Sequence, residues 1–234
     1  MPDTAPDTLT ILMPVFNELA TLERAVADAL GAELPVDGRQ LVIVDDGSTD
    51  GTRDLLRDTN WPDNVEVVYH ERNRGKGAAL RTGLGHATGT FAAILDADLE
   101  YAASDLAPLL EPLLAGDATV VFGSRAFTSQ SSFSFWYVIG NKAVTMATNV
   151  IYNCWISDVM TCHKVMRTDL FQSLRLRERG FAIEPEIAAR VLGAGERIYE
   201  VPVSYKARSR EEGKKLTTLD GLRVLRTLVR CRVS

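Results

Sequence analysis

The stretch TFAAILDADLE, residues 90–100, joins a predicted strand to a pair of acidic residues at its end. The apolar run fits a buried strand, and it stops at Asp96 and Asp98, which are separated by Ala97. In an extended segment, side chains two residues apart point the same way, so these carboxylates are expected on one side of the chain. Like charges this close repel unless a cation lies between them, so the stretch predicts a cation site.

Similar apolar runs lie on either side of this stretch, and amphipathic segments separate them. The predicted strands are LTILMPVF (9–16), LVIVDD (41–46), VEVVYH (65–70), TFAAILD (90–96) and ATVVFGS (118–124). The predicted helices cover 17–32, 76–87 and 105–116, and the turn-forming GSTDGT (47–52) follows the second strand. Continuously apolar strands that alternate with helices indicate a mainly parallel sheet with helices on both faces. The predicted fold class is therefore α/β, in a single catalytic domain.

Polar residues follow three of these strands, in PVFNE (14–18), VDDGS (44–48) and DAD (96–98). In open sheets of this kind ligands bind beyond the carboxyl ends of the strands, where the three segments are expected to converge. The glycine-rich loops of dinucleotide-binding and Walker-type sites are missing, because Leu80 and His70 stand where those motifs require glycine.

An acidic edge remains, made of five side chains: Glu18, Asp45, Asp46, Asp96 and Asp98. Hard oxygen ligands in a D-x-D arrangement suit Mg²⁺ or Mn²⁺, which shares its ligand shell with the phosphates of a substrate. The alternative is that the aspartates only form the turn after the strand, since Asp is common in turns.

The composition is that of an ordinary globular protein, with 46% hydrophobic and 24% charged residues among 234. Three cysteines at no metal-like spacing argue against disulfides, and the N-terminus lacks a signal-peptide pattern, so a cytoplasmic protein is expected. The net charge of −5 argues against a nucleic-acid-binding protein, although residues 203–234 carry nine Lys or Arg and only three acidic residues.

Further motifs follow the acidic edge in a characteristic order. They are NRGKGAALRTG (73–83), FGSR (122–125), SDVMTCHKVMR (157–167), GFAIEPEI (180–187), EVPVSYKAR (200–208) and EEGKKL (211–216). Together with MPVFNE, IVDDGSTDGT and ILDADLE, they make the chain resemble a family-2 glycosyltransferase of the GT-A fold over roughly residues 9–220. Within that family the motifs resemble the dolichyl-phosphate mannose synthase-like branch.

The resemblance implies a metal-dependent, inverting transfer of a hexose from a nucleotide sugar to a polyprenyl phosphate. Mannose from GDP-mannose is the first expectation and glucose from UDP-glucose the second. A saccharide acceptor is an alternative, although the Q-x-x-R-W signature of family-2 polymerases is absent. A nucleotide-sugar-binding protein with a dead site is the non-enzymatic alternative.

By the same resemblance, the nucleotide pocket is expected to consist of Pro14, Phe16, Glu18, Val44 and Asp46. The metal and the donor diphosphate are expected at Asp96, Ala97 and Asp98, with Asp98 as the direct ligand. Lys76 is expected either to bind phosphate at a helix start or to be solvated.

Four further predictions concern the rest of the site. Arg125 is expected to bind phosphate, of donor or acceptor. Asp158 is a candidate base, although a phosphate acceptor is already ionised and needs none. A late basic loop is expected to close over the diphosphate through Arg208 or Arg210 and through Lys214 or Lys215. Glu184 and Glu186 are either carboxylates of the site or the acidic start of a helix, and Cys162 and His163 are expected in the core rather than on zinc.

The domain boundaries are predicted as a disordered N-terminus over 1–8, the catalytic domain over 9–202 and a basic loop with an amphipathic helix over 203–234. That helix carries Leu216, Leu219, Leu222, Leu225 and Val229 on one stripe, with arginines opposite. It suits either an anionic membrane surface or packing on the protein. The apolar segment 133–156 is expected to be a protein-packed or interfacial helix. The protein is expected to be peripheral at the inner face of the membrane, with the membrane surface itself or a membrane protein as its partner.

Overall fold

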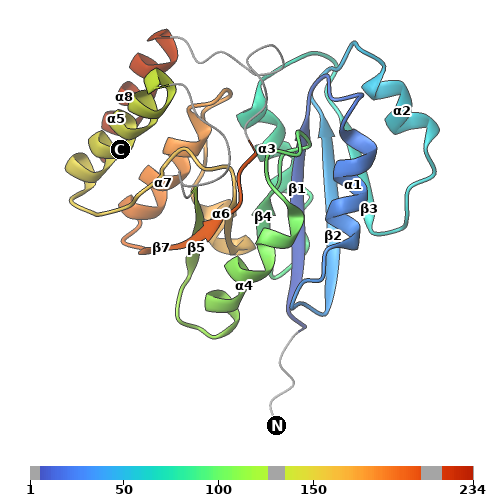
Figure 1. Cartoon of the computed structure of the whole chain (residues 1–234), viewed down its shortest axis with the longest axis horizontal. Helices are drawn as coiled ribbons and strands as arrows, with labels where there is room; N and C mark the ends of the chain where they lie inside the picture. Colours follow the sequence, from blue (N-terminus) through green and yellow to red (C-terminus); the bar gives the residue numbers. More distant parts are fainter. Residues whose placement is uncertain (1–5, 126–134, 207–217, 234) are drawn as a thin grey trace.

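The computed structural model describes residues 6–125, 135–206 and 218–233. A seven-stranded sheet forms its centre, in the order β3-β2-β1-β4-β6-β5-β7 (Figure 1). The strands are β1 (Thr8–Val15), β2 (Gly38–Asp45), β3 (Val65–Tyr69), β4 (Phe91–Ile94), β5 (Val120–Arg125), β6 (Lys164–Arg167) and β7 (Ile198–Val203). Only β6 runs antiparallel to its neighbours, β4 and β5, so the prediction of a mainly parallel α/β sheet is confirmed.

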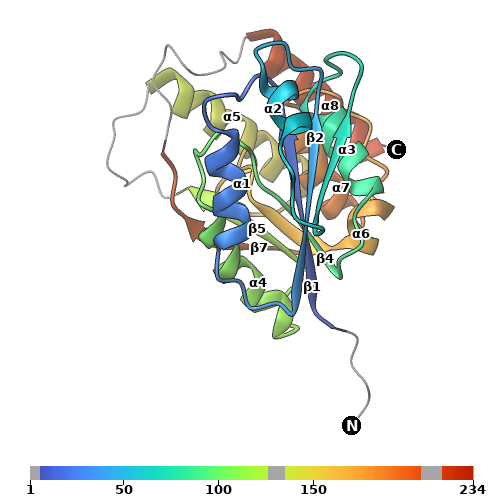
Figure 2. The same cartoon turned by 90° about the vertical axis from the view of Figure 1, so that its right-hand side faces the viewer.

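Helices cover both faces of this sheet, and Figure 2 shows the two layers on either side of it. One face packs against α1 (Leu22–Gly31) and α4 (Leu106–Leu114), which follows a short 3-10 turn. The other packs against α3 (Lys76–Gly85), α6 (Thr168–Ser173) and α7 (Ile183–Gly193). Consecutive residues of β1 point to opposite layers, so the strand is continuously apolar from Ile11 to Val15 rather than alternating.

Two further helices lie together at the end of the sheet that carries β5 and β7. They are α5 (Phe135–Tyr152) and α8 (Thr218–Val233), which contact each other and α7 (Figure 1). The helix expected over 133–156 is therefore α5. No helix among the residues described is both long and apolar enough to cross a membrane.

The first helix is shorter than predicted, because α1 begins at Leu22 rather than at residue 17. Asn17 adopts a left-handed conformation, with a φ of 57°, which a continuing helix does not allow. The loop instead forms hydrogen bonds with the loop after β2: Asn17 N–H donates to Ser48, and Glu18 N–H donates to Thr52. Polar pairing between the two loops thus delays the helix.

Two short helices were not predicted. The helix α2 (Thr52–Asp58) follows the turn-forming segment after β2, and α6 follows β6. Both span about two turns or fewer, a length at which hydrophobic periodicity is a weak signal. The first strand begins at Thr8, one residue before the predicted catalytic domain.

Candidate active site

The carboxyl ends of β1, β2 and β4 lie at one edge of the sheet, because these neighbouring strands are parallel. Pro14 and Val44 are paired in register at this edge, and Asp96 to Asp98 follow β4 directly. Pro14 and Phe16 are half-buried, whereas Val44 and Ala97 are buried. The fold thus gathers the three polar segments that follow the strands.

Lys76, the first residue of α3, lies at the centre of this edge. Its Nζ is 2.7 Å from Oδ2 of Asp96 and 2.7 Å from Oε1 of Glu184, which belongs to α7. The Sγ of Cys162 lies 3.2 Å from the same nitrogen. A lysine from one helix therefore joins carboxylates from a strand end and from another helix.

The charges around Lys76 decide its protonation. Burial alone pulls the pKa of this ammonium down, but Asp96, Cys162 and Glu184 together raise the pKa well above its usual value. Burial also raises the pKa of the Cys162 thiol well above its usual range. At neutral pH Lys76 is therefore an ammonium and Cys162 a protonated thiol, beside the side chains of Asp96 and Glu184.

The loop before α3 is held close to the segment before α7. Gly77 N–H donates to the carbonyl oxygen of Arg179 over 2.7 Å. A Cβ at Gly75 would meet that same carbonyl oxygen, and a Cβ at Gly77 would meet the one of Glu178. Gly75 also has a φ of 93°, which favours glycine. The glycines beside Lys76 thus permit a close backbone contact that seats the lysine.

Asp98 is half-buried and stands in a tight turn at the end of β4. Its Oδ1 accepts a hydrogen bond from Glu100 N–H over 3.1 Å, and the intervening Leu99 has a φ of 59°. Within the described ranges, no three His, Cys, Asp or Glu side chains come together as a metal-ligand set. Asp96 and Asp98 fit Mg²⁺ or Mn²⁺ only if water and the donor phosphates supply the other ligands, which these ions favour.

Arg125 and Asp158 form a buried, two-pronged ion pair. Nε of Arg125 donates to Oδ2 of Asp158 over 2.6 Å, and its terminal nitrogen donates to Oδ1 over 2.8 Å. Burial raises the pKa of Asp158, but the hydrogen bonds and charge of Arg125 outweigh this and leave the pKa below its usual value. Glu200 in β7 holds the segment in place by accepting hydrogen bonds from the backbone of Ser157 and Asp158.

Two tyrosines that sequence reasoning missed connect the acidic edge with this ion pair. The ring of Tyr101 lies 5.1 Å from that of Tyr205, and the guanidinium of Arg125 lies 5.1 Å above the Tyr205 ring. The hydroxyl of Tyr205 donates to Glu100 over 3.0 Å. Tyr101 follows the D-x-D motif by three residues, and that proximity is the only signal that pointed to it.

The carboxylate of Asp46 organises the neighbouring loop. It accepts hydrogen bonds from Arg74 N–H over 2.9 Å and from Gly75 N–H over 2.7 Å, and Nδ1 of His70 lies 2.7 Å away. Asp45 is buried and paired with Arg53 over 2.5 Å. Asp46 therefore positions the start of α3, and its predicted contact with nucleotide stays a prediction.

Glu18 lies in the loop after β1, where its carboxylate accepts a hydrogen bond from the Thr21 hydroxyl over 2.8 Å. Glu186 is fully buried, and one of its oxygens accepts hydrogen bonds from the backbone of Arg177 and Glu178. Of the two α7 carboxylates, only Glu184 therefore reaches Lys76. The four residues expected to close over the diphosphate, Arg208, Arg210, Lys214 and Lys215, lie outside the described residues.

His163 and Lys164 are both buried beneath the site. The His163 ring packs against Tyr101, with ring centroids 4.7 Å apart, and its Nε2 lies 3.1 Å from the carbonyl oxygen of Ala102. Nζ of Lys164 donates to the carbonyl oxygen of Thr161 and lies 4.6 Å from the centroid of the Phe122 ring. Burial lowers the pKa of Lys164 to about 8.

Comparisons with known proteins identify the family. The model of the family described as glycosyl transferase family 2 matches residues 10–175. The chain belongs to glycosyltransferase family 2. This family-2 chain is 29% identical over 204 residues to glycosyltransferase AglJ of Haloferax volcanii, a match that covers 87% of the chain and 64% of AglJ. It is 24% identical over 210 residues to dolichol-phosphate mannosyltransferase of Pyrococcus furiosus, covering 88% of the chain and 58% of that protein.

Solved structures confirm the GT-A fold of this family-2 chain. The structure of glucosyl-3-phosphoglycerate synthase from Mycobacterium tuberculosis with UDP is similar, with a TM-score of 0.71, 21% identity and coverage of 97% of this chain and 80% of that one. A second structure of that enzyme holds Mn²⁺, UDP and glucosyl-3-phosphoglycerate, with a TM-score of 0.69, 20% identity and coverage of 97% and 80%. The chain spans 64% and 58% of the length of the two curated relatives named above.

Proposed function

We propose that the protein transfers a hexose from a nucleotide sugar to a polyprenyl phosphate, with inversion at the anomeric carbon. The observation that carries this proposal is the way carboxylates are used at the sheet edge. Asp158 is bound to Arg125 with a lowered pKa, and Asp96 and Glu184 share the ammonium of Lys76. Each of these three side chains is thus already paired with a cationic side chain of the protein, and none is held in place to take a proton from an acceptor hydroxyl.

Such a site suits an acceptor that arrives ionised. A sugar hydroxyl must lose its proton to a general base during transfer, whereas a phosphate monoester is an anion at neutral pH. In the proposed step an acceptor phosphate oxygen forms a bond to the anomeric carbon. The bond from that carbon to the donor diphosphate breaks, and its electron pair stays on the departing nucleoside diphosphate.

The chain's own residues hold the reactants by charge. Lys76, at the start of α3, faces the position expected for the diphosphate, where a helix N-terminus also favours anions. Arg125 presents a planar guanidinium suited to phosphate oxygens. Asp96 and Asp98 would hold Mg²⁺ or Mn²⁺, which when bound neutralises charge on the departing diphosphate.

The comparisons support the classes of donor and acceptor. The Pyrococcus relative is named for mannosyl transfer to dolichol phosphate, and the Mycobacterium structures contain UDP with Mn²⁺. GDP-mannose is the donor we favour and UDP-glucose the second. A polyprenyl acceptor also places the reaction at a membrane surface.

A nucleotide-release assay tests this function. GDP-mannose and UDP-glucose are each supplied with Mn²⁺ or Mg²⁺ and a short-chain polyprenyl phosphate, and the released nucleoside diphosphate is measured. We expect release that requires both the metal and the lipid phosphate. Release only with a saccharide acceptor would overturn the acceptor assignment, and donor binding without release under any condition would overturn the enzymatic one.

A further inference from the structure

The helix α8 packs on the protein through one side only. Val224, Leu228 and Cys231 are buried in a cluster with residues of α7 and α5. The Tyr152 hydroxyl of α5 donates a hydrogen bond to the carbonyl oxygen of Leu228 over 2.9 Å, which fixes the rotation of α8. Leu225 and Val229, the members of the predicted apolar stripe whose side chains the structure describes, do not belong to this packed side.

Leu225 and Val229 of the predicted stripe are exposed, and so is Val233 at the end of the helix. Successive members are four residues apart, so they form a line along the outer side of α8. Val233 is 80% exposed, whereas Leu228 and Cys231 on the inner side of the same helix end are buried. Of the two roles expected for this helix, packing on the protein is thus performed by another set of residues.

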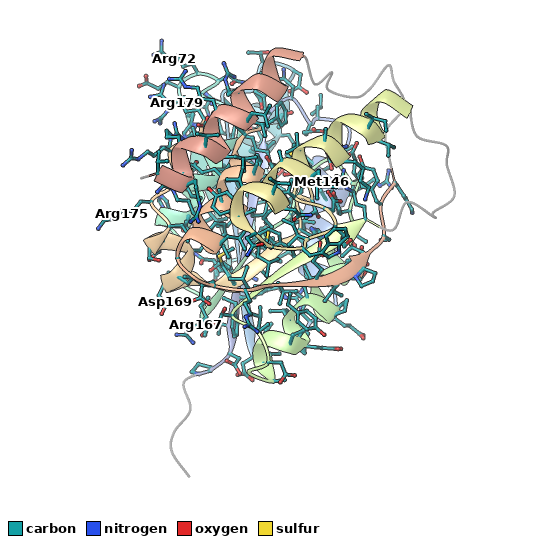
Figure 3. The ribbon with its side chains drawn as sticks, turned by 90° about the vertical axis from the view of Figure 1, so that its left-hand side faces the viewer. Arg72, Met146, Arg167, Asp169, Arg175 and Arg179 are labelled. Carbon is teal, nitrogen blue, oxygen red and sulfur yellow. The ribbon has the colours of Figure 1, made fainter. Side chains whose placement is uncertain are left out.

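A matching line runs along α5. Ile139, Met146 and Val150 are exposed, and Val150 retains 74% of its accessible surface. Figure 3 shows α5 and α8 side by side on one face of the molecule, with Met146 labelled on α5. We define the α5–α8 face by six residues: Ile139, Met146, Val150, Leu225, Val229 and Val233. Lys142 is the charged side chain of α5 beside this line, and its Nζ lies 3.3 Å from the carbonyl oxygen of Ser157.

Arginines border this face on α8 and continue onto neighbouring loops. We define the basic band by its exposed members: Arg72, Arg74, Arg177, Arg179, Arg223 and Arg226. In Figure 3, Arg72 and Arg179 project from the edge of the molecule next to α8. The segments that carry these arginines also contain two acidic residues whose side chains the structure describes: Glu71, which is exposed, and Glu178, which binds Arg230 and Thr227 of α8. Among the described side chains of these segments, the six arginines of the basic band thus outnumber two acidic residues.

We infer that the α5–α8 face and the basic band together dock the protein on an anionic lipid bilayer. An apolar line flanked by arginines is the pattern of a helix that lies in a bilayer interface, with its apolar side chains among acyl chains and its cations among headgroups. A second copy of this chain fits the face less well, because a symmetric contact would bring the arginines of both chains together.

The position of the basic band relative to the candidate active site supports a lipid partner. This support rests on the proposed function. The loop of Arg72 and Arg74 leads directly into Lys76, and Gly75 lies against the carbonyl oxygen of Arg179. The basic band therefore ends at the residues that surround Lys76. A polyprenyl phosphate held in the bilayer would present its headgroup at this end.

Vesicle flotation tests the docking surface directly. The protein is mixed with vesicles of phosphatidylcholine alone, or of phosphatidylcholine with phosphatidylglycerol, at low and at high salt. We expect binding that requires phosphatidylglycerol and that weakens with salt. Equal binding to both vesicles, or none to either, would overturn the inference. A dimer in analytical ultracentrifugation that Val229→Asp dissociates would also overturn it, in favour of a second copy.

Two variants and two controls locate the contact. Arg226→Glu reverses a charge of the basic band and Val229→Asp places a charge in the apolar line, and each is expected to weaken vesicle binding about tenfold. Arg24→Glu, exposed on α1, and Tyr199→Asp, exposed on β7, make the same kinds of change elsewhere and should leave binding unchanged. Circular dichroism confirms that each variant is folded. Equal loss of binding in controls and variants would exclude a localised surface.

A paired turnover assay separates the two proposals. Nucleotide release is measured with a short polyprenyl phosphate in solution and with a long-chain one in anionic vesicles. Arg226→Glu should retain turnover in solution and lose it on vesicles. Turnover on vesicles unchanged by Arg226→Glu would overturn the docking surface and leave the proposed function standing. Vesicle binding that Arg226→Glu weakens, without turnover on either polyprenyl phosphate, would overturn the function alone.

Discussion

Lys76 and Asp96 form a largely buried ion pair, with Nζ and Oδ2 2.7 Å apart. The repulsion expected between carboxylates at the end of β4 is thus relieved in part by a lysine that α3 supplies. Glu184 lies on the other side of the same ammonium, at 2.7 Å. The site therefore carries its own cation in addition to any divalent metal at Asp98.

Replacing this cation is expected to destabilise the fold. Lys76→Met leaves Asp96 and Glu184 close together without a partner, and we expect a loss of about 3 kcal/mol in the free energy of unfolding at pH 7. Urea denaturation measures it. Lys142→Met, on an exposed lysine, should change stability by less than about 0.5 kcal/mol.

The D-x-D motif is expected to be essential for turnover but not for folding. Asp98→Ala should lower nucleotide release by roughly a hundredfold or more, because the departing diphosphate loses a metal ligand, and excess EDTA should do the same to the unaltered protein. The melting temperature should stay within a few degrees, since Asp98 is half-buried. Asp54→Asn, an exposed acidic residue of α2, is the matched control. Full activity of Asp98→Ala would exclude the metal assignment.

The ion pair of Arg125 and Asp158 should reveal itself in the pH dependence of stability. The pKa of Asp158 is lowered on folding, so its contribution is present above the unfolded pKa of about 4 and is lost as pH falls below it. Asp158→Asn should cost about 3 kcal/mol at pH 7, because Arg125 stays buried without an anion. The difference in the free energy of unfolding between the unaltered protein and Asp158→Asn, measured by urea denaturation, should become smaller as the pH falls toward 3. A difference that stays constant with pH would contradict the ion pair between Arg125 and Asp158.

Much of the fold could be predicted because its strands are continuous apolar runs. Leu41 to Val44, for example, are buried on both faces of the sheet, and such runs allow few alternatives. The start of α1 could not be predicted in this way. The hydrogen bonds that delay the helix, such as that from Asn17 N–H to Ser48, join loops that are distant in the sequence.

The site residues that a sequence motif places at the end of a strand could be predicted. The residues that only the packing of distant elements brings to the site could not. Asp96 and Asp98 follow β4 as the alternation of strands and helices implied. The choice of Glu184 over Glu186 as the partner of Lys76 depends on the rotation of α7, because one side chain faces Lys76 and the other faces Arg230. Tyr205 reaches the site from the end of β7, and no local pattern indicates this.

The buried lysine Lys164 should also make the stability of the protein depend on pH. Its pKa falls on folding to about 8, so between pH 8 and its usual value near 10.5 the unfolded chain binds a proton that the folded chain has lost. Stability attributable to this group therefore rises with pH over that window. Lys164→Met should stabilise the protein by up to about 3 kcal/mol at pH 7. The difference in the free energy of unfolding between the unaltered protein and Lys164→Met, measured by urea denaturation, should disappear as the pH approaches 10.

The close contact at Gly77 has a mechanical consequence. The carbonyl oxygen of Arg179 is bonded to the first turn of α3, and the adjacent Glu178 is bonded to Thr227 and Arg230 of α8. A short stretch of backbone, packed so closely that no side chain fits between its parts, thus connects α8 with Lys76. A tilt of α8 would therefore be transmitted through this backbone as a displacement of Lys76. A contact made by α8 at the molecular surface would in this way change the position of a side chain at the sheet edge.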